Sequence, residues 1–279
     1  MTKPIEQSTF LTEILQLKRQ RIAEAKSGIS VEDLKVKAIE ARKNAVPHRL
    51  REVLQNKDKI NIIAEIKRAS PSKGVINDKI DVAETARSYE RGGACAISVL
   101  TEEDKFKGSL EDLKTVRKNV SLPVLRKDFV FDKFQIYEAA AAGADVILLI
   151  AAMLDDEVLL KLHRLAEEEL GLEVLLEVHT LEELKRAEKT GAKIIGVNNR
   201  DLHSFKVSLD VSRELIKHAR TDALLIAESG LRTREDLIEL KSLGFSGFLI
   251  GETLMRSENI EKELKKLATN KHEIIQKFS

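Results

Sequence analysis

Short apolar runs recur along most of the chain, about every 20–30 residues, and stretches of helical period separate them. The runs are short and continuously apolar, which is typical of strands buried on both faces of a parallel sheet. A glycine precedes several of them, where a left-handed residue commonly ends a helix. Eight runs fit this description: 60–67, 94–100, 122–128, 145–151, 173–178, 193–198, 223–228 and 245–251.

Eight repeated strand–helix units favour a closed barrel over an open doubly wound sheet. An open nucleotide-binding sheet would also need a G-x-G-x-x-G turn after its first strand, and none follows residues 60–67. The sequence therefore predicts an α/β fold, a (β/α)8 TIM barrel.

The first 55 residues have a different hydrophobic pattern, which is helical and contains no strand-like run. Aliphatic residues recur at helical spacing over 10–25, and a second helical stretch over 30–43 has acidic residues in its first turn. We therefore expect residues 1–55 to form a helical extension and residues 56–270 to form the barrel. The 279 residues would then be a single domain rather than two.

Composition and charge exclude several classes of protein. Apolar residues make up 43% of the chain, which is enough for a large core. Lys and Arg total 47 against 46 Asp and Glu, so the net charge of +1 predicts neither a nucleic acid nor a membrane as partner. The polar start of the chain and the lack of a long apolar run predict no secretion signal and no membrane span. The single cysteine, Cys95, excludes an intrachain disulfide and fits a cytoplasmic location.

Charged side chains end most of the predicted strands. Catalytic groups of a barrel come from these C-terminal ends, so the charges are candidates for a site. The strand period of two puts Glu65 and Lys67 on one face, where opposite charges across the barrel mouth would pair. A single residue of this kind could equally be a solvated loop start. The candidates are Glu65, Lys67, Lys127, Glu177, Asn198, Arg200, Glu228 and Glu252.

Glycines follow strands seven and eight, as Ser229-Gly230 and Ile250-Gly251. Backbone amides at these two positions bind phosphate in many barrels, which predicts a phosphorylated small-molecule substrate.

His179 and His203 lack further ligands at metal-binding spacing, so we interpret both as structural or exposed and expect no metal. Cys95 precedes its strand, away from the mouth, and is interpreted as a buried structural thiol.

Several segments carry a family resemblance: 63–74, 98–102, 125–129, 176–179, 196–202, 228–230 and 250–252. In these, and over about residues 8–265, the chain resembles the indole-3-glycerol-phosphate synthase family of tryptophan biosynthesis. The resemblance implies a carboxy-lyase (EC 4.1.1.48) that needs neither cofactor nor metal. Its reaction would close the ring of 1-(2-carboxyphenylamino)-1-deoxyribulose 5-phosphate with loss of carbon dioxide and water. It also implies extra helices over the barrel mouth and weak association with other enzymes of the pathway.

The resemblance also implies roles for particular residues. Lys127 would be the general acid at the carbonyl, beside Glu65 and Lys67. Glu177 would either orient Lys127 or act as a base in the dehydration, and the division of acid–base work stays open. Asn198, Arg200 and Glu228 would position substrate hydroxyls, with Asn198 and Ser229 in the catalytic set. The phosphate would be faced by Lys67, Ser70, Ser229, Gly230, Gly251 and the amide of Glu252. Pro71, Leu100, Phe106 and Phe129 would hold the aromatic ring, and Leu249 would also contact the substrate.

Two alternatives compete with this interpretation. The first is another phosphosugar barrel, such as phosphoribosylanthranilate isomerase. Its catalytic residues look like a Cys at the end of strand one and an Asp later, whereas strand one of this chain ends in Glu65 and Lys67. A non-catalytic sensor barrel could keep Gly230 and Gly251 without needing Lys127. The chain is also too short for a fusion of two barrels. Residues 68–79, rich in Ser, Lys and Gly, are predicted to form a mobile loop over the site.

Overall fold

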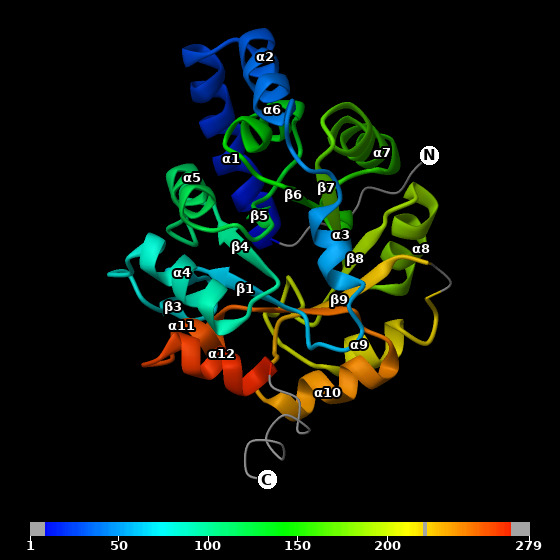
Figure 1. Cartoon of the computed structure of the whole chain (residues 1–279). Helices are drawn as coiled ribbons and strands as arrows, with labels where there is room; N and C mark the ends of the chain where they lie inside the picture. The colour runs from blue at the N-terminus through cyan, green and yellow to red at the C-terminus, as the bar shows by residue number, and fades with distance from the viewer. Residues whose placement is uncertain (1–8, 220–221, 269–279) are drawn as a thin grey trace.

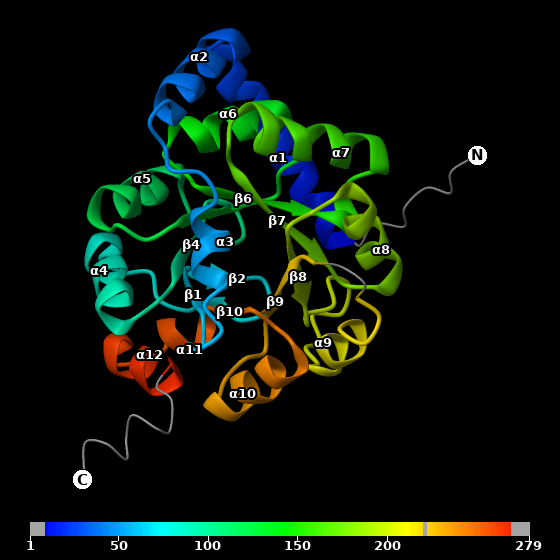
Figure 2. The same cartoon turned by 45° about the vertical axis from the view of Figure 1, so that its right-hand side comes forward.

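A computed structural model describes residues 9–219 and 222–268, and it is a closed parallel barrel with helices around it (Figures 1 and 2). The strand order around the barrel is β1-β10-β9-β8-β7-β6-β5-β4, and each predicted apolar run supplies one strand, so the predicted fold is confirmed. The strands are β1 (Ile62–Ile66), β4 (Ala96–Leu100), β5 (Val124–Lys127), β6 (Val146–Ile150), β7 (Glu173–Val178), β8 (Ile194–Asn198), β9 (Leu224–Glu228) and β10 (Gly247–Ile250).

Helices follow the strands and cover the outside of the barrel (Figure 1). Gly93, Gly191 and Gly244 end three of them in the left-handed conformation, as the sequence pattern predicted. The helices are α4 (Val82–Gly92), α5 (Leu110–Asn119), α6 (Lys133–Ala141), α7 (Asp156–Arg164), α8 (Leu181–Thr190), α9 (Asp210–Leu215), α10 (Arg234–Leu243), α11 (Glu252–Met255) and α12 (Ile260–Ala268), with a 3-10 turn η1 (Ala151–Met153) and a π turn η2 (Leu165–Glu169).

The strand register brings the ends of distant segments together. Asn198 pairs in register with Glu228, and Leu100 with Lys127. Because all barrel strands are parallel, their C-terminal ends share one mouth. Residues in β1, β4 and β6 to β8 are buried along their whole length, so the barrel interior below the mouth is a packed core.

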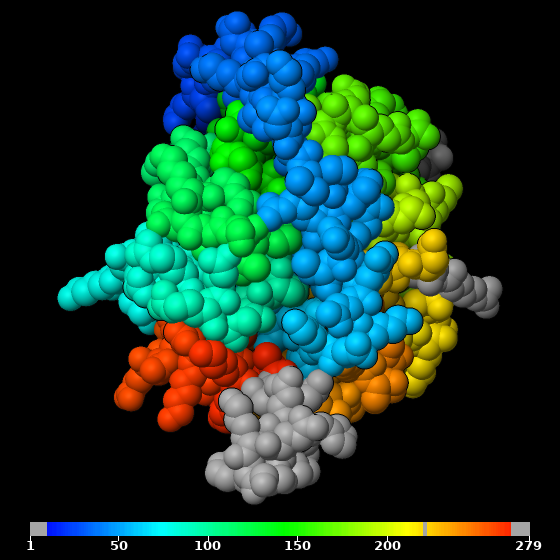
Figure 3. All heavy atoms as spheres, viewed as in Figure 1, coloured from blue at the N-terminus to red at the C-terminus, as the bar shows by residue number. Residues whose placement is uncertain are grey.

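The N-terminal extension contacts both ends of the barrel. It consists of α1 (Thr9–Gly28), α2 (Val31–Arg42) and α3 (Arg49–Leu54). At the mouth, α1 contacts the chain after β5, where Lys18 Nζ lies 2.8 Å from Asp128 Oδ1. At the other end, the α3 residue Leu50 donates its backbone N–H to Glu173 Oε2, at the start of β7 (2.6 Å). In Figure 3 the segment that contains α3 covers the middle of the face shown.

This arrangement differs from a simple cap over the mouth, since only α1 lies there, while α2 packs against α6. Residues 1–8 of the predicted extension and residues 220–221 and 269–270 of the predicted barrel lie outside the described residues. None of the described helices has the length and apolar character needed to cross a membrane.

Candidate active site

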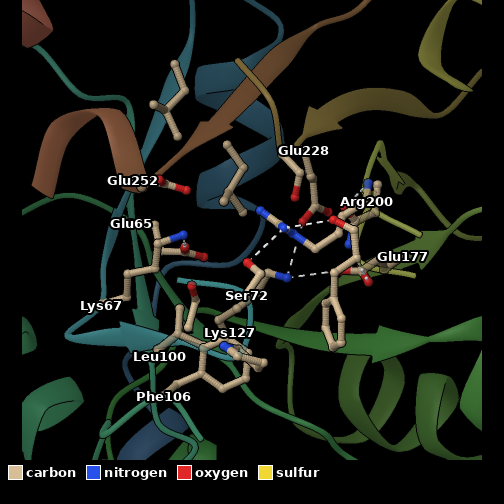
Figure 4. Close-up of a pocket in the computed structure, with 18 of the residues that line it drawn as sticks. Glu65, Lys67, Ser72, Leu100, Phe106, Lys127, Glu177, Arg200, Glu228 and Glu252 are labelled. Atoms are coloured by element: carbon tan, nitrogen blue, oxygen red, sulfur yellow. Dashed lines mark hydrogen bonds and ion pairs between the residues drawn. The ribbon is translucent and has the colours of Figure 1, made fainter. Parts of the chain in front are cut away.

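One cavity of about 370 Å3 opens at the C-terminal ends of the barrel strands (Figure 4). The strand-end residues and loop residues that the sequence singled out converge on it, apart from Gly230. The predicted residues in its lining are Glu65, Lys67, Ser70, Pro71, Leu100, Phe106, Lys127, Phe129, Glu177, Asn198, Arg200, Glu228, Ser229, Leu249, Gly251 and Glu252.

Lys127, at the end of β5, lies between two buried carboxylates. Its Nζ is 2.9 Å from Glu177 Oε2, on β7, and 3.2 Å from Glu228 Oε2, on β9. Burial disfavours the charged ammonium, but the attraction of Glu177, Glu228 and Glu65 outweighs it and raises the pKa of Lys127. Lys127 is therefore an ammonium at neutral pH, held between two carboxylates at the barrel mouth.

Glu177 and Glu228 have the same partner but different surroundings. Glu177 Oε1 accepts a hydrogen bond from Asn198 Nδ2 (3.0 Å). Burial alone would raise the pKa of Glu177, but Lys127 and His179 hold it well below its usual range. Glu228 Oε1 has no hydrogen-bond partner among the described residues. Burial, together with the nearby charge of Glu177, raises the pKa of Glu228 to about 7 despite the attraction of Lys127.

Gly196 makes room for the Glu228 carboxylate. It lies in β8, which is directly beside β9. On the β7 side it pairs in register with Glu177. A Cβ at this position would overlap Glu228 Oε1. Glycine is therefore required here by close approach of a neighbouring side chain, and the sequence resemblance had included it only as part of the 196–202 motif.

Glu65 and Lys67, on the opposite side of the cavity in Figure 4, form a second ion pair, with Lys67 Nζ 2.9 Å from Glu65 Oε1. The predicted shared face of β1 thus holds in the structure. Gly251, at the end of β10, packs against both side chains, and a Cβ there would lie 2.6 Å from Glu65 Oε1. Gly251 therefore lets the end of β10 approach the pair closely.

The turn after β9 is conformationally unusual. Ser229 and Gly230 both adopt the left-handed conformation, at φ 65° and 81°. Asn199 Nδ2 braces the turn by donating to the Ser229 carbonyl (3.2 Å). Gly230 lies outside the cavity lining, against Val207, so its glycine is explained by the turn and by this contact. Across the cavity, the Ser70 hydroxyl is buried and forms no hydrogen bond with any described residue.

Aromatic rings line one wall of the cavity. Phe106 and Phe129, both predicted, have ring centroids 6.2 Å apart. Phe10, from α1, meets Phe129 edge-on at 6.2 Å, and it also meets Phe205 at 5.1 Å. Phe10 and Phe205 were missed by the sequence reasoning. Phe10 belongs to a helical pattern in which nothing distinguishes a residue facing the site from one facing the core.

The segment predicted as a mobile loop contains a short antiparallel hairpin, β2 (Ala69–Ser70) and β3 (Gly74–Val75). Its base is fastened by Arg68, whose guanidinium donates to Asp112 Oδ1 (3.0 Å). Its tip reaches the other side of the site, where Arg200 donates to the Ser72 hydroxyl (3.1 Å). Ser72 was not singled out from the sequence, and the mobility of this segment stays a prediction.

Charged residues of α11 and of the loop after β9 line the remaining edge of the cavity. Glu252 lines the cavity and pairs with Arg256, with Arg256 Nε 3.2 Å from Glu252 Oε1. Arg256 and Arg232 also line the cavity, and neither was predicted. Both follow the strand ends by several residues, beyond the positions that the strand-end argument covers.

The remaining candidates fall outside the cavity lining. His203 is exposed, whereas His179 is partly buried beside Glu177 and precedes the Thr180 cap of α8. Burial raises the pKa of Cys95 to about 12, as expected for an inert structural thiol. One acidic trio within residues 9–219 and 222–268 could reach a single metal ion, namely Glu102, Glu103 and Asp104. Its carboxylates instead accept backbone amides or pair with Lys18 and Arg21 of α1.

A closed parallel barrel with a partly buried ammonium and buried carboxylates at its mouth defines a barrel enzyme with a small-molecule site. The family model described as indole-3-glycerol phosphate synthase matches residues 11–267. The chain therefore belongs to the indole-3-glycerol phosphate synthase family, carboxy-lyases (EC 4.1.1.48) of tryptophan biosynthesis, and the resemblance drawn from its motifs is confirmed. Neither the isomerase nor the sensor alternative survives this match.

Curated relatives agree with the family model. The chain is 45% identical to the indole-3-glycerol phosphate synthase of Carboxydothermus hydrogenoformans over 264 residues, which cover 92% of this chain and 99% of the relative. It is 53% identical to that of Aquifex aeolicus over 208 residues, covering 74% and 80%.

Solved structures share the fold at low identity. One is an N-acetylmannosamine-6-phosphate 2-epimerase from Clostridium perfringens, with a TM-score of 0.59, 19% identity and coverage of 79% of this chain and 96% of that one. Another is a 3-hexulose-6-phosphate synthase from Salmonella typhimurium, with a TM-score of 0.60, 16% identity and coverage of 75% and 96%. At these identities the likeness is one of fold alone.

Proposed function

We propose that this chain converts 1-(2-carboxyphenylamino)-1-deoxyribulose 5-phosphate to indole-3-glycerol phosphate at the cavity of the barrel mouth, with Lys127 as the general acid. The observation that carries the proposal is the partly buried ammonium of Lys127 between the buried carboxylates of Glu177 and Glu228. Ring closure turns a carbonyl oxygen into a hydroxyl, so a proton must reach that oxygen as the arene carbon attacks. A charged amine at the cavity surface supplies such a proton.

The carboxylates around Lys127 then have separate tasks. Glu228, with a pKa of about 7, exchanges a proton readily near neutral pH. When Glu228 is protonated, Lys127 loses one of its two close counter-charges and releases its own proton more easily. Glu65 and Lys67, across the cavity, form a second ion pair that could serve as acid and base in the later loss of water. The division of acid–base work among Glu65, Lys67 and Glu177 stays open within the proposal.

The two ends of the substrate differ chemically, and so do the two sides of the cavity. The ring would pack against Phe106, Phe129 and Leu100, where a dry surface favours loss of the carboxylate as its charge disperses. The phosphate would lie near Lys67 and the Ser70 hydroxyl, which has no hydrogen-bond partner in the described part of the chain, with Ser229 and Gly251 beside it. The Glu252 side chain pairs with Arg256, which reduces the repulsion between that carboxylate and the phosphate.

The barrel and its N-terminal helices would act as one domain, because α1 supplies Phe10 to the cavity. A cytoplasmic location and weak association with other tryptophan-pathway enzymes belong to the same proposal. The unpaired thiol of Cys95, within the described residues, is compatible with a reducing compartment.

Direct conversion tests the proposal. The purified chain is treated with a chelator to remove metal and is then incubated with 1-(2-carboxyphenylamino)-1-deoxyribulose 5-phosphate. The products are separated, and their masses are determined by mass spectrometry. We expect a product lighter by one carbon dioxide and one water, with indole fluorescence. A product of unchanged mass, or none, would contradict the proposed reaction.

A further inference from the structure

His179 lies behind the site, in a position that the proposed mechanism does not yet use. It directly follows β7, and its side chain is 12% exposed. Its Nε2 is 3.4 Å from Glu177 Oε1, and its Nδ1 is 3.2 Å from Glu183 Oε2, in the first turn of α8. The contact with Glu177 lacks hydrogen-bond alignment and is an ion pair. Since His179 is outside the cavity lining, it reaches the reaction only through Glu177.

We propose that His179 is a positioning residue, an imidazolium that keeps Glu177 ionised and oriented toward Lys127 throughout the reaction. The inference rests on the proposed role of Lys127 as the acid. It assigns Glu177 to orientation and charge stabilisation, leaving proton uptake to the other carboxylates of the site.

The occupancy of the Glu177 oxygens supports this assignment. Oε2 faces Lys127 at 2.9 Å, and Oε1 accepts from Asn198 at 3.0 Å while facing His179. A carboxylate has about four lone-pair sites, of which two accept hydrogen bonds, from Lys127 and Asn198, while the His179 imidazole lies against Oε1 as an ion-pair partner. Glu177 thus has little room for a proton, in contrast to Glu228, whose Oε1 has no partner among the described residues.

The charge of His179 is set by its two acidic neighbours. Burial alone would lower its pKa, but Glu177 from β7 and Glu183 from α8 raise it to about 10. His179 therefore stays protonated over the range in which Glu228 titrates. When Lys127 gives its proton to the substrate, Glu177 loses its nearest cation, but the imidazolium remains. Glu177 then stays ionised and draws a proton back to Lys127.

The test compares His179→Gln with the wild type in the full chain, since glutamine keeps a donor near Nε2 but removes the charge. We expect kcat to fall about tenfold with KM within about twofold, because His179 does not touch substrate. The pKa of Glu177 should rise toward its usual range, because the carboxylate loses a nearby cation. His163→Gln is the matched control, since His163 is also buried but lies on α7, 3.9 Å from Glu167. It should leave kcat within about twofold of wild type.

A double-variant cycle separates positioning from a general structural effect. If His179 acts through Glu177, Glu177→Gln with His179→Gln should be no slower than Glu177→Gln alone. A further tenfold loss in the double variant would overturn the inference. So would wild-type kcat in His179→Gln, or a neutral His179 at pH 8 in the NMR spectrum of the wild type.

Two more outcomes keep this inference distinct from the proposed function. Failure of the wild-type chain to form the product would contradict the proposed reaction. A low kcat in Glu177→Gln together with a wild-type kcat in His179→Gln would contradict only the positioning role. If His179→Gln does not fold, Glu183→Gln removes the outer partner instead. It should lower the pKa of His179 and reduce kcat about two- to threefold, and an unchanged pKa would contradict the inference.

Discussion

The two ends of the barrel both bury carboxylates, yet they use them differently. At the N-terminal end, Asp145 Oδ2 accepts from Arg49 (2.9 Å), Arg117 (2.8 Å) and the Val124 amide (2.9 Å). Glu173 there accepts two backbone amides of α3 and the Arg51 side chain.

At the mouth, by contrast, Lys127 is shared by two carboxylates, and one oxygen of Glu228 has no partner among the described residues. The fully satisfied end holds the fold together, whereas the under-satisfied end retains the capacity to exchange protons and bind a ligand. The comparison separates structural buried charge from reactive buried charge within a single molecule.

Removing the ammonium of the mouth should have the largest effect. Lys127→Ala is expected to lower kcat by about 10²–10⁴, because a positioned acid contributes on that order. Steady-state indole fluorescence measures the rate, and circular dichroism checks that the variant folds. Lys161→Ala, an exposed lysine on α7, is the control and should behave as wild type. Near-normal turnover of Lys127→Ala would break the assignment of chemistry to the mouth.

The opposite end should respond in stability instead. Asp145→Asn leaves the guanidinium groups of Arg49 and Arg117 without their counter-charge, at a cost of about 2–3 kcal/mol in the free energy of unfolding. Denaturant unfolding measures the change, and kcat measured well below the transition should stay within about twofold of wild type. A loss of kcat larger than the loss of stability would show that the two ends are coupled.

Glu228 should make stability depend on pH. Its pKa rises from 4.5 in the unfolded chain to about 7 in the fold, so between these values the folded protein holds a proton that the unfolded chain has released. The free energy of unfolding therefore falls as pH rises through that window, by about 1–3 kcal/mol from this group. Unfolding curves at pH 5 and pH 8 should show this decline in wild type and a smaller one in Glu228→Gln. Equal declines would mean that Glu228 does not titrate there.

The smallest effect concerns the aromatic wall at the mouth. Phe10→Ala removes two edge-on ring contacts, worth about 1 kcal/mol, and should raise KM about fivefold with little change in kcat. Initial rates over a range of substrate concentration measure both constants. A change in kcat alone would indicate that α1 affects the acid–base groups rather than ring binding.

The barrel and most of its site followed from local signals in the sequence. A buried parallel strand is continuously apolar, and a charge at its C-terminal end must face the mouth, so Glu65, Lys127 and Glu177 could be found without coordinates. Phe10 and Phe205 could not, because aromatic residues in helices and loops have the same pattern whether they face a core or a site. The position of α3 at the far end also depends on long-range contacts, such as the one between Leu50 and Glu173.

The different behaviour of Glu177 and Glu228 was equally beyond the sequence. Both end a strand and both contact Lys127, so spacing treats them alike. What separates them is the set of neighbours around each carboxylate. Asn198 of β8 and the adjoining His179 lie beside Glu177, whereas the bare backbone of Gly196 lies beside Glu228.

That bare backbone has an evolutionary consequence. Positions 196 and 228 share one small volume, so any side chain acquired at Gly196 displaces the Glu228 carboxylate unless residue 228 shrinks in the same lineage. A replacement of Gly196 alone is therefore blocked by Glu228, and it becomes possible only together with a change at residue 228. Among distant homologues, a larger residue at the first position should occur together with a shorter one at the second.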